Sequence, residues 1–487
     1  MSATSTSIYE KFLDKKTQLG GEHGFEPIWM PDFLFDFQKS LVEWALRKGR
    51  AAIFADCGLG KTPMQLVWAE NVVRKMNGRV LVLTPLAVGV QTVEQGARFG
   101  VECGRSRAGE SIAPRIVVAN YEQLHRFSSA DFCGVVCDES SILKHFSGKT
   151  QKTVTRFMAK IPYRLLCTAT AAPNDYIELG TASEALGELG YSDMLSRFFK
   201  QSDKQPHRME QIKEQNAARD DVKHNYFGKL AFRAAQQIGQ WRLKGHAEEP
   251  FWRWVASWAR ACRKPSDLGF GDGAFVLPPL EERHHVVIPR RPRDGMLFTV
   301  PAMGLGEERE ERRRTLQERC ELAAELATKH GQQAILWVQY NPEGDLIEKL
   351  IPGSVQVAGS DSDEAKEERL LAFVHGEARF LITKAKIAGF GLNLQNCSNV
   401  VTFATHSYES YYQSVRRCWR FGQKNQVTVD IISTEGETRV AANMERKAAL
   451  MAAMFDRMVE HMHQATRLTG RVFEKKVEVP QWLSAIN

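Results

Sequence analysis

Two series of short apolar runs, each run followed by a segment of helical length, constrain the fold of this chain more than any other feature. The runs are rich in valine, isoleucine, leucine and alanine, and most contain no charged residue. Strands of this kind are typical of parallel sheets that helices cover on both faces. The runs lie at 51–54, 80–84, 116–119, 135–137 and 165–168, and then at 334–338, 355–357, 380–383, 400–403 and 427–432. We therefore predict an α/β protein with two parallel-sheet lobes in tandem.

The segment between the two series differs in composition. Residues 201–270 hold 13 Lys and Arg against 8 Asp and Glu, and strand-like runs are scarce there. Phe251, Trp254 and Trp258 follow one another at helical spacing, which predicts an amphipathic helix that docks on a lobe. The predicted division is a lead at 1–32, a first lobe at 33–199, a helical insert with a linker at 200–284, a second lobe at 285–455 and a tail at 456–487.

Composition excludes several classes of protein. The 487 residues are 43% hydrophobic and 25% charged, which is an ordinary globular mixture. No charge-free apolar stretch approaches the roughly 18 residues of a membrane span, and the start lacks the apolar core of a secretory signal, so we expect a soluble cytoplasmic protein. The nine cysteines form no CxxC pair, which argues against a disulfide framework or a zinc site. A net charge of +7 with local basic patches is compatible with a partner that carries phosphate.

The strongest local signal is Ala55-Asp-Cys-Gly-Leu-Gly-Lys-Thr62, which follows a predicted strand and opens a predicted helix. In a phosphate-binding loop, glycines such as Gly58 and Gly60 let backbone N–H groups approach the phosphates, and the helix adds its positive end. Lys61 would then hold phosphate and Thr62 would hold Mg²⁺. Because Ala55 stands where the strict pattern has glycine, a glycine-rich turn with a chance Lys-Thr pair is the alternative.

Two adjacent acids, Asp138 and Glu139, end another predicted strand. Neighbouring carboxylates repel each other, and a divalent cation accounts for that cost. In such a site the first acid holds Mg²⁺ and the second orients and deprotonates the attacking water. Together with the loop, the acids predict a nucleotide-hydrolysing site.

In their order, these motifs resemble those of superfamily 2 helicases, particularly the Swi/Snf-like DNA translocases, and the compact chain is similar to forms found in bacteria and their phages. The motifs that carry the resemblance are Phe37-Gln38, residues 82–85 with Gln91, residues 118–121, the Asp-Glu-Ser-Ser sequence at 138–141, residues 168–174 with Glu178, residues 382–394 and residues 413–423. Two departures are the shorter phosphate loop and the lack of a recognisable chromatin-reading module.

The resemblance implies two RecA-like lobes with ATP and Mg²⁺ between them. It implies catalytic roles for Lys61, Asp138, Glu139, Arg417 and Arg420, the last two as arginine fingers from the second lobe. Nucleotide binding is implied for Gln38, Gly58, Gly60, Lys61, Thr62, Gly391 and Gln413, with Mg²⁺ at Thr62 and Asp138. Nucleic acid is implied at Thr84, Asn120 and Lys384, with contacts mainly to phosphates.

The leading hypothesis is an ATP-dependent motor on double-stranded DNA, without sequence preference and nucleoid-associated in a bacterial or phage-infected cell. The same motifs permit an RNA or single-strand helicase. A third hypothesis is an ATP-gated DNA-binding subunit of a phage-defence or repair complex. The segment 200–275 would either grip DNA or dock a protein partner, and a monomer is favoured.

Overall fold

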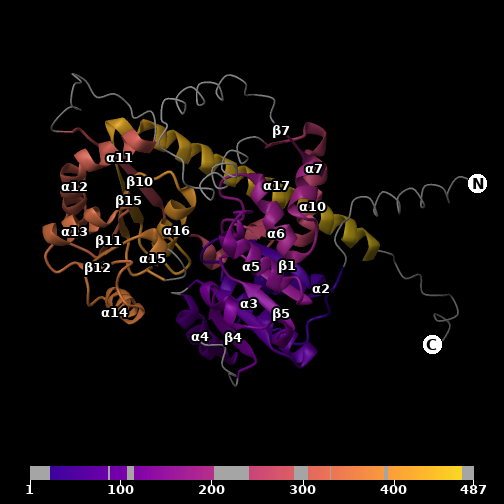
Figure 1. Ribbon diagram of the computed structural model, residues 1–487. Helices are drawn as coiled ribbons and strands as arrows, with labels where there is room; N and C mark the ends of the chain where they lie inside the picture. The colour runs from indigo at the N-terminus through magenta and orange to yellow at the C-terminus, as the bar shows by residue number, and fades with distance from the viewer. Residues whose placement is uncertain are drawn as a thin grey trace, which may run out of the picture.

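The chain folds into two α/β lobes, each built on one parallel sheet (Figure 1). The computed structural model describes residues 22–85, 88–106, 114–201, 241–289, 305–329, 331–388 and 393–473. All ten predicted apolar runs are strands, so the predicted fold class is confirmed. None of the described helices combines the length and the apolar character needed to cross a membrane.

The first sheet has seven strands in the order β3-β4-β2-β5-β6-β1-β9, and every neighbouring pair is parallel. In β1, Ala52 and Phe54 face one buried cluster, whereas Ala51 and Ile53 face another. Burial on both faces is why the run shows no polar alternation. The strands are β1 (Arg50–Ala55), β2 (Val80–Thr84), β3 (Cys103–Arg105), β4 (Ile116–Asn120), β5 (Gly134–Cys137), β6 (Tyr163–Cys167) and β9 (Ala259–Cys262).

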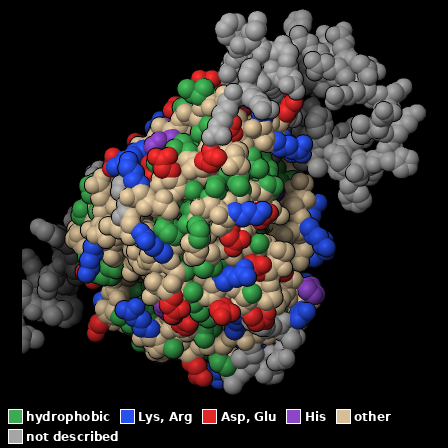
Figure 2. All heavy atoms as spheres, turned by 90° about the vertical axis from the view of Figure 1, so that its left-hand side faces the viewer, with side chains coloured by type: hydrophobic (Ala, Val, Ile, Leu, Met, Phe, Trp, Pro, Cys, Tyr) green, Lys and Arg blue, Asp and Glu red, His purple; other side chains and the backbone are tan. Residues whose placement is uncertain are grey.

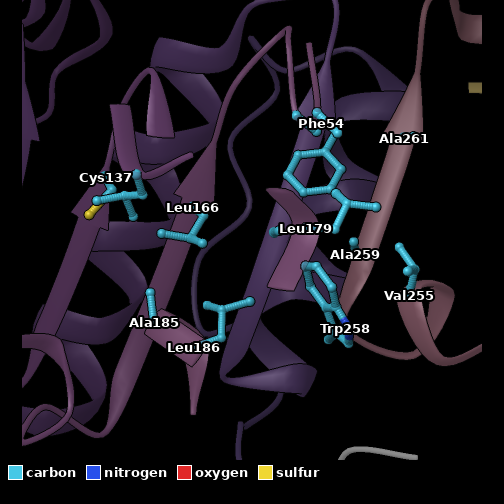
Figure 3. Close-up of a cluster of buried hydrophobic side chains, with 14 of the residues drawn as sticks. Phe54, Cys137, Leu166, Leu179, Ala185, Leu186, Val255, Trp258, Ala259 and Ala261 are labelled. Atoms are coloured by element: carbon cyan, nitrogen blue, oxygen red, sulfur yellow. The ribbon is translucent and has the colours of Figure 1, made fainter. Parts of the chain in front are cut away.

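Helices cover both faces of this sheet. They are α2 (Asp36–Lys48), α3 (Lys61–Met76), α4 (Val88–Phe99), α5 (Lys149–Met158), α6 (Leu179–Leu186), α7 (Tyr191–Phe198) and α10 (Glu248–Trp258). Figure 3 shows the cluster on one face, where Phe54 and Leu166 of the sheet share the core with Trp258 and with Leu179 of α6.

The second sheet has six parallel strands in the order β10-β15-β14-β11-β13-β12. Its strands are β10 (Leu280–Val287), β11 (Ala334–Trp337), β12 (Val355–Val357), β13 (Phe380–Thr383), β14 (Asn399–Phe403) and β15 (Val427–Thr434). Its helices are α11 (Leu305–Arg314), α12 (Leu316–Thr328), α13 (Asn341–Leu350), α14 (Asp363–Val374), α15 (Ala385–Ala388) and α16 (Tyr408–Cys418). A buried ion pair between Arg319 and Glu343, 2.8 Å long, ties α12 to α13.

The segment predicted as a separate insert contributes to both sheets. β9 pairs with β1, and β10, which straddles the predicted boundary at 284, pairs with β15. The predicted helix is α10, and its aromatic residues are buried against the first sheet. The apolar residues of α10 pack on the first sheet, and this places the chain that follows beside β1. The sequence Ala-Arg-Ala-Cys is too short to indicate a strand by itself. A small antiparallel pair, β7 (Phe199–Gln201) with β8 (Trp241–Leu243), flanks residues 202–240, which lie outside the described residues.

A long C-terminal helix, α17 (Thr438–Phe473), returns from the second lobe to the first (Figure 1). Its buried apolar residues recur at helical spacing and join the core of the first lobe. They are Met451, Met454, Phe455, Met458 and Met462. The helix runs through the predicted boundary at 455, so a separate tail does not begin there.

We predict that Trp254→Ala destabilises the first lobe by roughly 3–5 kcal/mol, because it opens a cavity at a fully buried site. Urea unfolding monitored by circular dichroism measures the change. Trp241→Ala, at a half-buried position on the same cluster, is the control and should cost less. Equal losses in the two variants would mean that α10 is not a central part of the core.

Candidate active site

The carboxyl ends of the first sheet's strands meet at one edge and carry the motif residues. β1 leads into the phosphate loop, β5 into Asp138 and β6 into the segment that starts at Thr168. Since β6 lies between β1 and β5, the three motifs are neighbours. This edge is the usual place for ligands in an open parallel sheet.

The phosphate loop has the backbone that its glycines allow. Gly58 and Gly60 have positive φ angles of 88° and 74°, and Gly60 directly precedes α3. A Cβ atom on Gly60 would lie 2.3 Å from Nε2 of Gln38, and that amide donates a hydrogen bond to the carbonyl of Leu59. Gln38, for which the resemblance implies nucleotide binding, therefore contacts the loop directly and supports its backbone.

Lys61 points back into its own loop. Its Nζ donates to the carbonyl of Ala55 at 3.1 Å and lies 3.5 Å from the carbonyl of Asp56. Thr62 follows it as the second residue of α3 and is half-buried. The ammonium group therefore lies against the backbone of the loop. A phosphate bound by the loop would replace these carbonyls as the partner of Lys61.

Asp138 is buried and held from two sides. Nε2 of Gln65 donates to Oδ1 of Asp138 at 2.7 Å, and the Tyr121 hydroxyl donates to its backbone carbonyl at 2.6 Å. Burial raises the pKa of Asp138 to about 6, the Glu139 carboxylate adds to the rise, and Gln65 and Lys61 oppose it. A nearby divalent cation would favour the ionised form. Gln65 is not part of any motif that the sequence indicated, although it lies one helical turn after Lys61.

Glu139 has an uncommon backbone conformation for a residue with a side chain, with φ 48° and ψ 50°. Its Oε1 lies 3.6 Å from Nη2 of Arg417, whereas its buried Oε2 has no hydrogen-bond partner among the described residues. A carboxylate oxygen without a partner is suited to accept a hydrogen bond from a water molecule.

The second lobe faces these residues with α16 and the turn after it. Gln413 and Arg417 on α16 are buried, and Nε2 of Gln413 lies 3.4 Å from the Thr170 hydroxyl in the segment after β6. A Cβ atom on Gly58 would lie 3.2 Å from Cβ of Arg420. Burial, together with the nearby charge of Arg417, lowers the pKa of Arg420 to about 10, so Arg420 remains a cation at neutral pH. The structure thus brings one predicted arginine finger, Arg420, to the phosphate loop and the other, Arg417, to Glu139.

Further contacts between the lobes were not predicted. Arg416 of α16 forms a buried ion pair with Asp56 of the phosphate loop, and the Tyr412 hydroxyl donates to the same carboxylate. Lys144 pairs with Glu409 at the start of α16, and Glu409 also accepts from Thr170 at 3.4 Å. Asp56 and Arg416 both lie inside quoted motifs, but opposite charges 360 positions apart in the chain do not reveal a pair.

Two of the three predicted nucleic-acid residues are not at the surface. Thr84 is 0% exposed and Asn120 is 3% exposed, so neither side chain reaches a phosphate in this arrangement. Both end buried strands, β2 and β4, whose pairing encloses them. Lys384 is half-buried and its Nζ donates to Oδ1 of Asn341 at 2.5 Å. Gly391 lies outside the described residues.

The residues present fit a magnesium-bound nucleotide. Gly58 and Gly60 give the loop the left-handed backbone of a phosphate-binding turn, and Asp138 is a buried carboxylate that a cation would stabilise. Within the described residues, no group of three or more His, Cys, Asp or Glu could hold a metal ion. One carboxylate and one hydroxyl, with phosphate oxygens completing the shell, is the usual way for a protein to bind Mg²⁺.

Comparison with known proteins bears on the second lobe. Residues 317–422 match the family described as "Helicase conserved C-terminal domain". No curated protein matches the chain. A solved structure, the Sulfolobus solfataricus SWI2/SNF2 ATPase core in complex with dsDNA, is similar at a TM-score of 0.37 and 17% identity, over 91% of this chain and 97% of that chain. A similarity of that size does not bear on function.

The matched residues extend from α12 to the turn that carries Arg420. The second lobe therefore has a helicase C-terminal domain, which confirms the predicted helicase resemblance in that part of the chain.

We predict a pH-dependent contribution of Glu178 to stability. Burial raises its pKa to about 7, against hydrogen bonds from Asn174 that lower it; Lys144 also lowers it and Glu409 raises it. Between its ordinary value of 4.5 and about 7, the folded state holds the proton that the unfolded state has released, so stability falls as pH rises.

Glu178→Gln should remove this slope, which is at most about 1.4 kcal/mol per pH unit. The variant should therefore gain stability relative to the parent between about pH 5 and about pH 7 in urea unfolding. The exposed Glu348→Gln is the control and should follow the parent at both pH values. A constant difference between Glu178→Gln and the parent would contradict the raised pKa.

Proposed function

We propose that this protein is an ATP-dependent superfamily 2 motor of the Swi/Snf type that moves along duplex DNA or remodels it, or remodels protein–DNA complexes. The observation that carries the proposal is that Arg417 contacts Glu139 and Arg420 contacts the phosphate loop across the interface between the lobes. The compact form resembles bacterial and phage proteins, which favours action on cellular or phage DNA in the cytoplasm.

Each residue has a role that its position supports. Lys61 and the loop N–H groups bind the phosphates, while Thr62 and Asp138 hold Mg²⁺, which when bound draws charge from the phosphate oxygens. Glu139 orients the attacking water and accepts its proton. Arg417 and Arg420 neutralise charge that builds on the γ-phosphoryl group, an effect of roughly 10³–10⁵ in rate for arginine fingers.

Because the two sets of residues belong to different lobes, hydrolysis requires the lobes to be closed. Opening after hydrolysis withdraws the arginines, and repeated closure then moves any strand held by both lobes. This coupling between chemistry and lobe movement is the basis for proposing a motor rather than a simple ATPase. An RNA or single-strand helicase uses the same cleft, and the nucleic acid that stimulates turnover distinguishes the two.

We predict that Lys61→Ala abolishes ATP turnover and that Glu139→Gln lowers it about 10²–10⁴-fold while nucleotide binding persists. The reason is that Lys61 contributes to phosphate binding whereas Glu139 acts on water. Turnover is measured with duplex DNA, single-stranded DNA or RNA, and binding with a fluorescent ATP analogue. The exposed Glu122→Gln is the matched control.

Parent-like turnover in Glu139→Gln would show that Glu139 is not the base. Stimulation by RNA alone would replace the duplex DNA motor with an RNA helicase.

The nucleic-acid face requires exposed cations in place of Thr84 and Asn120, and α5 offers them. Lys149, Lys152 and Arg156 are exposed and lie on one side of the helix, and residues 149–160 contain no acid. No ion pair engages these three side chains in the described part of the chain, whereas the exposed Arg47 and Arg74 both pair with glutamates. Such a face suits phosphates.

The position of α5 supports this assignment. The helix begins five residues after Lys144, which contacts Glu409 of the second lobe, so its amino-terminal end lies near the interface between the lobes. By contrast, the outward face of the second lobe carries basic and acidic side chains interspersed, with hydrophobic ones between them (Figure 2). We therefore propose α5 as a surface of the first lobe that contacts the DNA backbone.

We predict that changing Lys149, Lys152 and Arg156 together to Gln weakens DNA binding and lowers its salt slope by roughly 0.9 for each phosphate that is no longer neutralised. Fluorescence anisotropy with duplex DNA at several salt concentrations measures the slope. The control replaces Lys329, Lys349 and Arg379 with Gln. This removes the same charge from exposed positions that lie shortly before β11, β12 and β13 of the second sheet. Equal effects of the two triple variants would assign the change to net charge and not to α5.

A further inference from the structure

The phosphate loop contains an acid, Asp56, that the roles proposed above do not explain. A carboxylate in such a loop would repel a triphosphate unless a cation neutralised it. Asp56 is 5% exposed, and its Oδ2 accepts a hydrogen bond from Nη2 of Arg416, which comes from the other lobe and is equally buried. The loop and α16 are thus joined by a buried ion pair.

We propose that Arg416 is a positioning residue, which through Asp56 docks α16 on the phosphate loop and thereby places Arg417 and Arg420 for hydrolysis. This inference rests on the proposed ATPase function and adds to it a residue that does not itself act on the phosphates. It also assigns Asp56 a role as the docking point on the first lobe.

Asp56 is fixed as a docking point on its own lobe. Its Oδ1 accepts the backbone N–H of Cys57 at 2.6 Å, and its own N–H donates to the carbonyl of Cys262 in β9 at 3.0 Å. The Tyr412 hydroxyl of α16 donates to the same Oδ1. Both carboxylate oxygens are therefore engaged, and two of their donors come from a single helix of the second lobe.

Arg416 is held just as firmly on its own side. Its guanidinium lies 4.7 Å from the ring centroid of Trp419 and 5.6 Å from that of Tyr412. The indole N–H of Trp419 in turn donates to the carbonyl of Pro278 at 2.7 Å. Burial lowers the pKa of Arg416 to about 9, which leaves it charged at neutral pH. Two aromatic rings and a carboxylate leave this guanidinium little freedom to follow a reacting phosphate.

The consequence for catalysis follows from the short distance along the chain. Arg417 is the next residue and lies 3.6 Å from Glu139, and Arg420 is one turn further, beside Gly58. A shift of α16 relative to the loop would move both arginines together. Misplacement of reacting groups by about 1 Å can cost on the order of 10²-fold in rate.

The experiment is a double-mutant cycle on DNA-stimulated ATP turnover with Arg416→Gln, Asp56→Asn and the double variant. Each single variant should lower kcat by about 10²-fold and change the KM for ATP much less, since the defect arises in the closed state. The double variant should be no slower than the slower single variant, because both remove one interaction. Arg416→Lys, which keeps the charge, should restore part of kcat.

The matched control is the exposed ion pair between Arg263 and Asp456, which joins the first lobe to α17 at 2.6 Å. Arg263→Gln and Asp456→Asn should both resemble the parent. Circular dichroism and thermal melting establish that the Asp56 and Arg416 variants are folded, and Arg416→Lys provides the comparison if Arg416→Gln is not.

Four outcomes would overturn the inference. Multiplicative losses in the double variant would mean that the two residues act separately. A raised KM with unchanged kcat would make Arg416 a ligand of bound ATP. Parent-like turnover of the Arg416 and Asp56 variants, while Lys61→Ala is inactive, would reject this inference and leave the ATPase function standing. A parent that does not hydrolyse ATP would reject both.

Discussion

Among the described residues, two buried ion pairs and one partly buried pair join α16 to the first lobe, and the proposed chemistry depends on them. Asp56 pairs with Arg416, Glu139 with Arg417, and Lys144 with Glu409. The second residue of each pair belongs to α16. Charges removed from water are costly, and opposite partners in contact offset that cost only when the lobes are closed. Loss of one partner leaves the other buried and unpaired, which is strongly destabilising. These pairs therefore specify one closed arrangement more than they add to stability.

The same interface explains how a loop, two acids and two arginines become one site. All the first-lobe groups lie at the carboxyl edge of a parallel sheet, because parallel strands end at the same side. The residues of the second lobe that contact this edge come from α16 and not from its sheet. Aromatic contacts reinforce the junction, since Phe421 of the second lobe stacks on Phe275 at 4.6 Å and lies 6.2 Å from Phe35. In the proposed mechanism, hydrolysis is coupled to lobe closure because the candidate site needs residues of both lobes.

Burial also separates residues that support the site from residues that can meet a partner. Thr84 and Asn120 end strands in the predicted places, yet the first sheet encloses both side chains. The cations of α5 are exposed, and residues 149–160 contain no acid. α17 adds a second connection between the lobes, because its methionines are part of the first lobe's core although the helix starts in the second. A movement of the lobes relative to each other would therefore bend or shift this helix.

The sequence by itself determined the two sheets and indicated the residues of the candidate nucleotide site. Apolar runs without alternation require burial on both faces, and glycine, lysine and paired acids after such runs have few other uses. It did not determine that α10 and β9 belong to the first lobe, since a four-residue strand is defined by its neighbour β1 and not by its own pattern. Nor did it reveal Asp56 with Arg416, or Gln65 with Asp138. Those contacts join residues distant in the chain, and only the tertiary structure decides which charges are removed from water together.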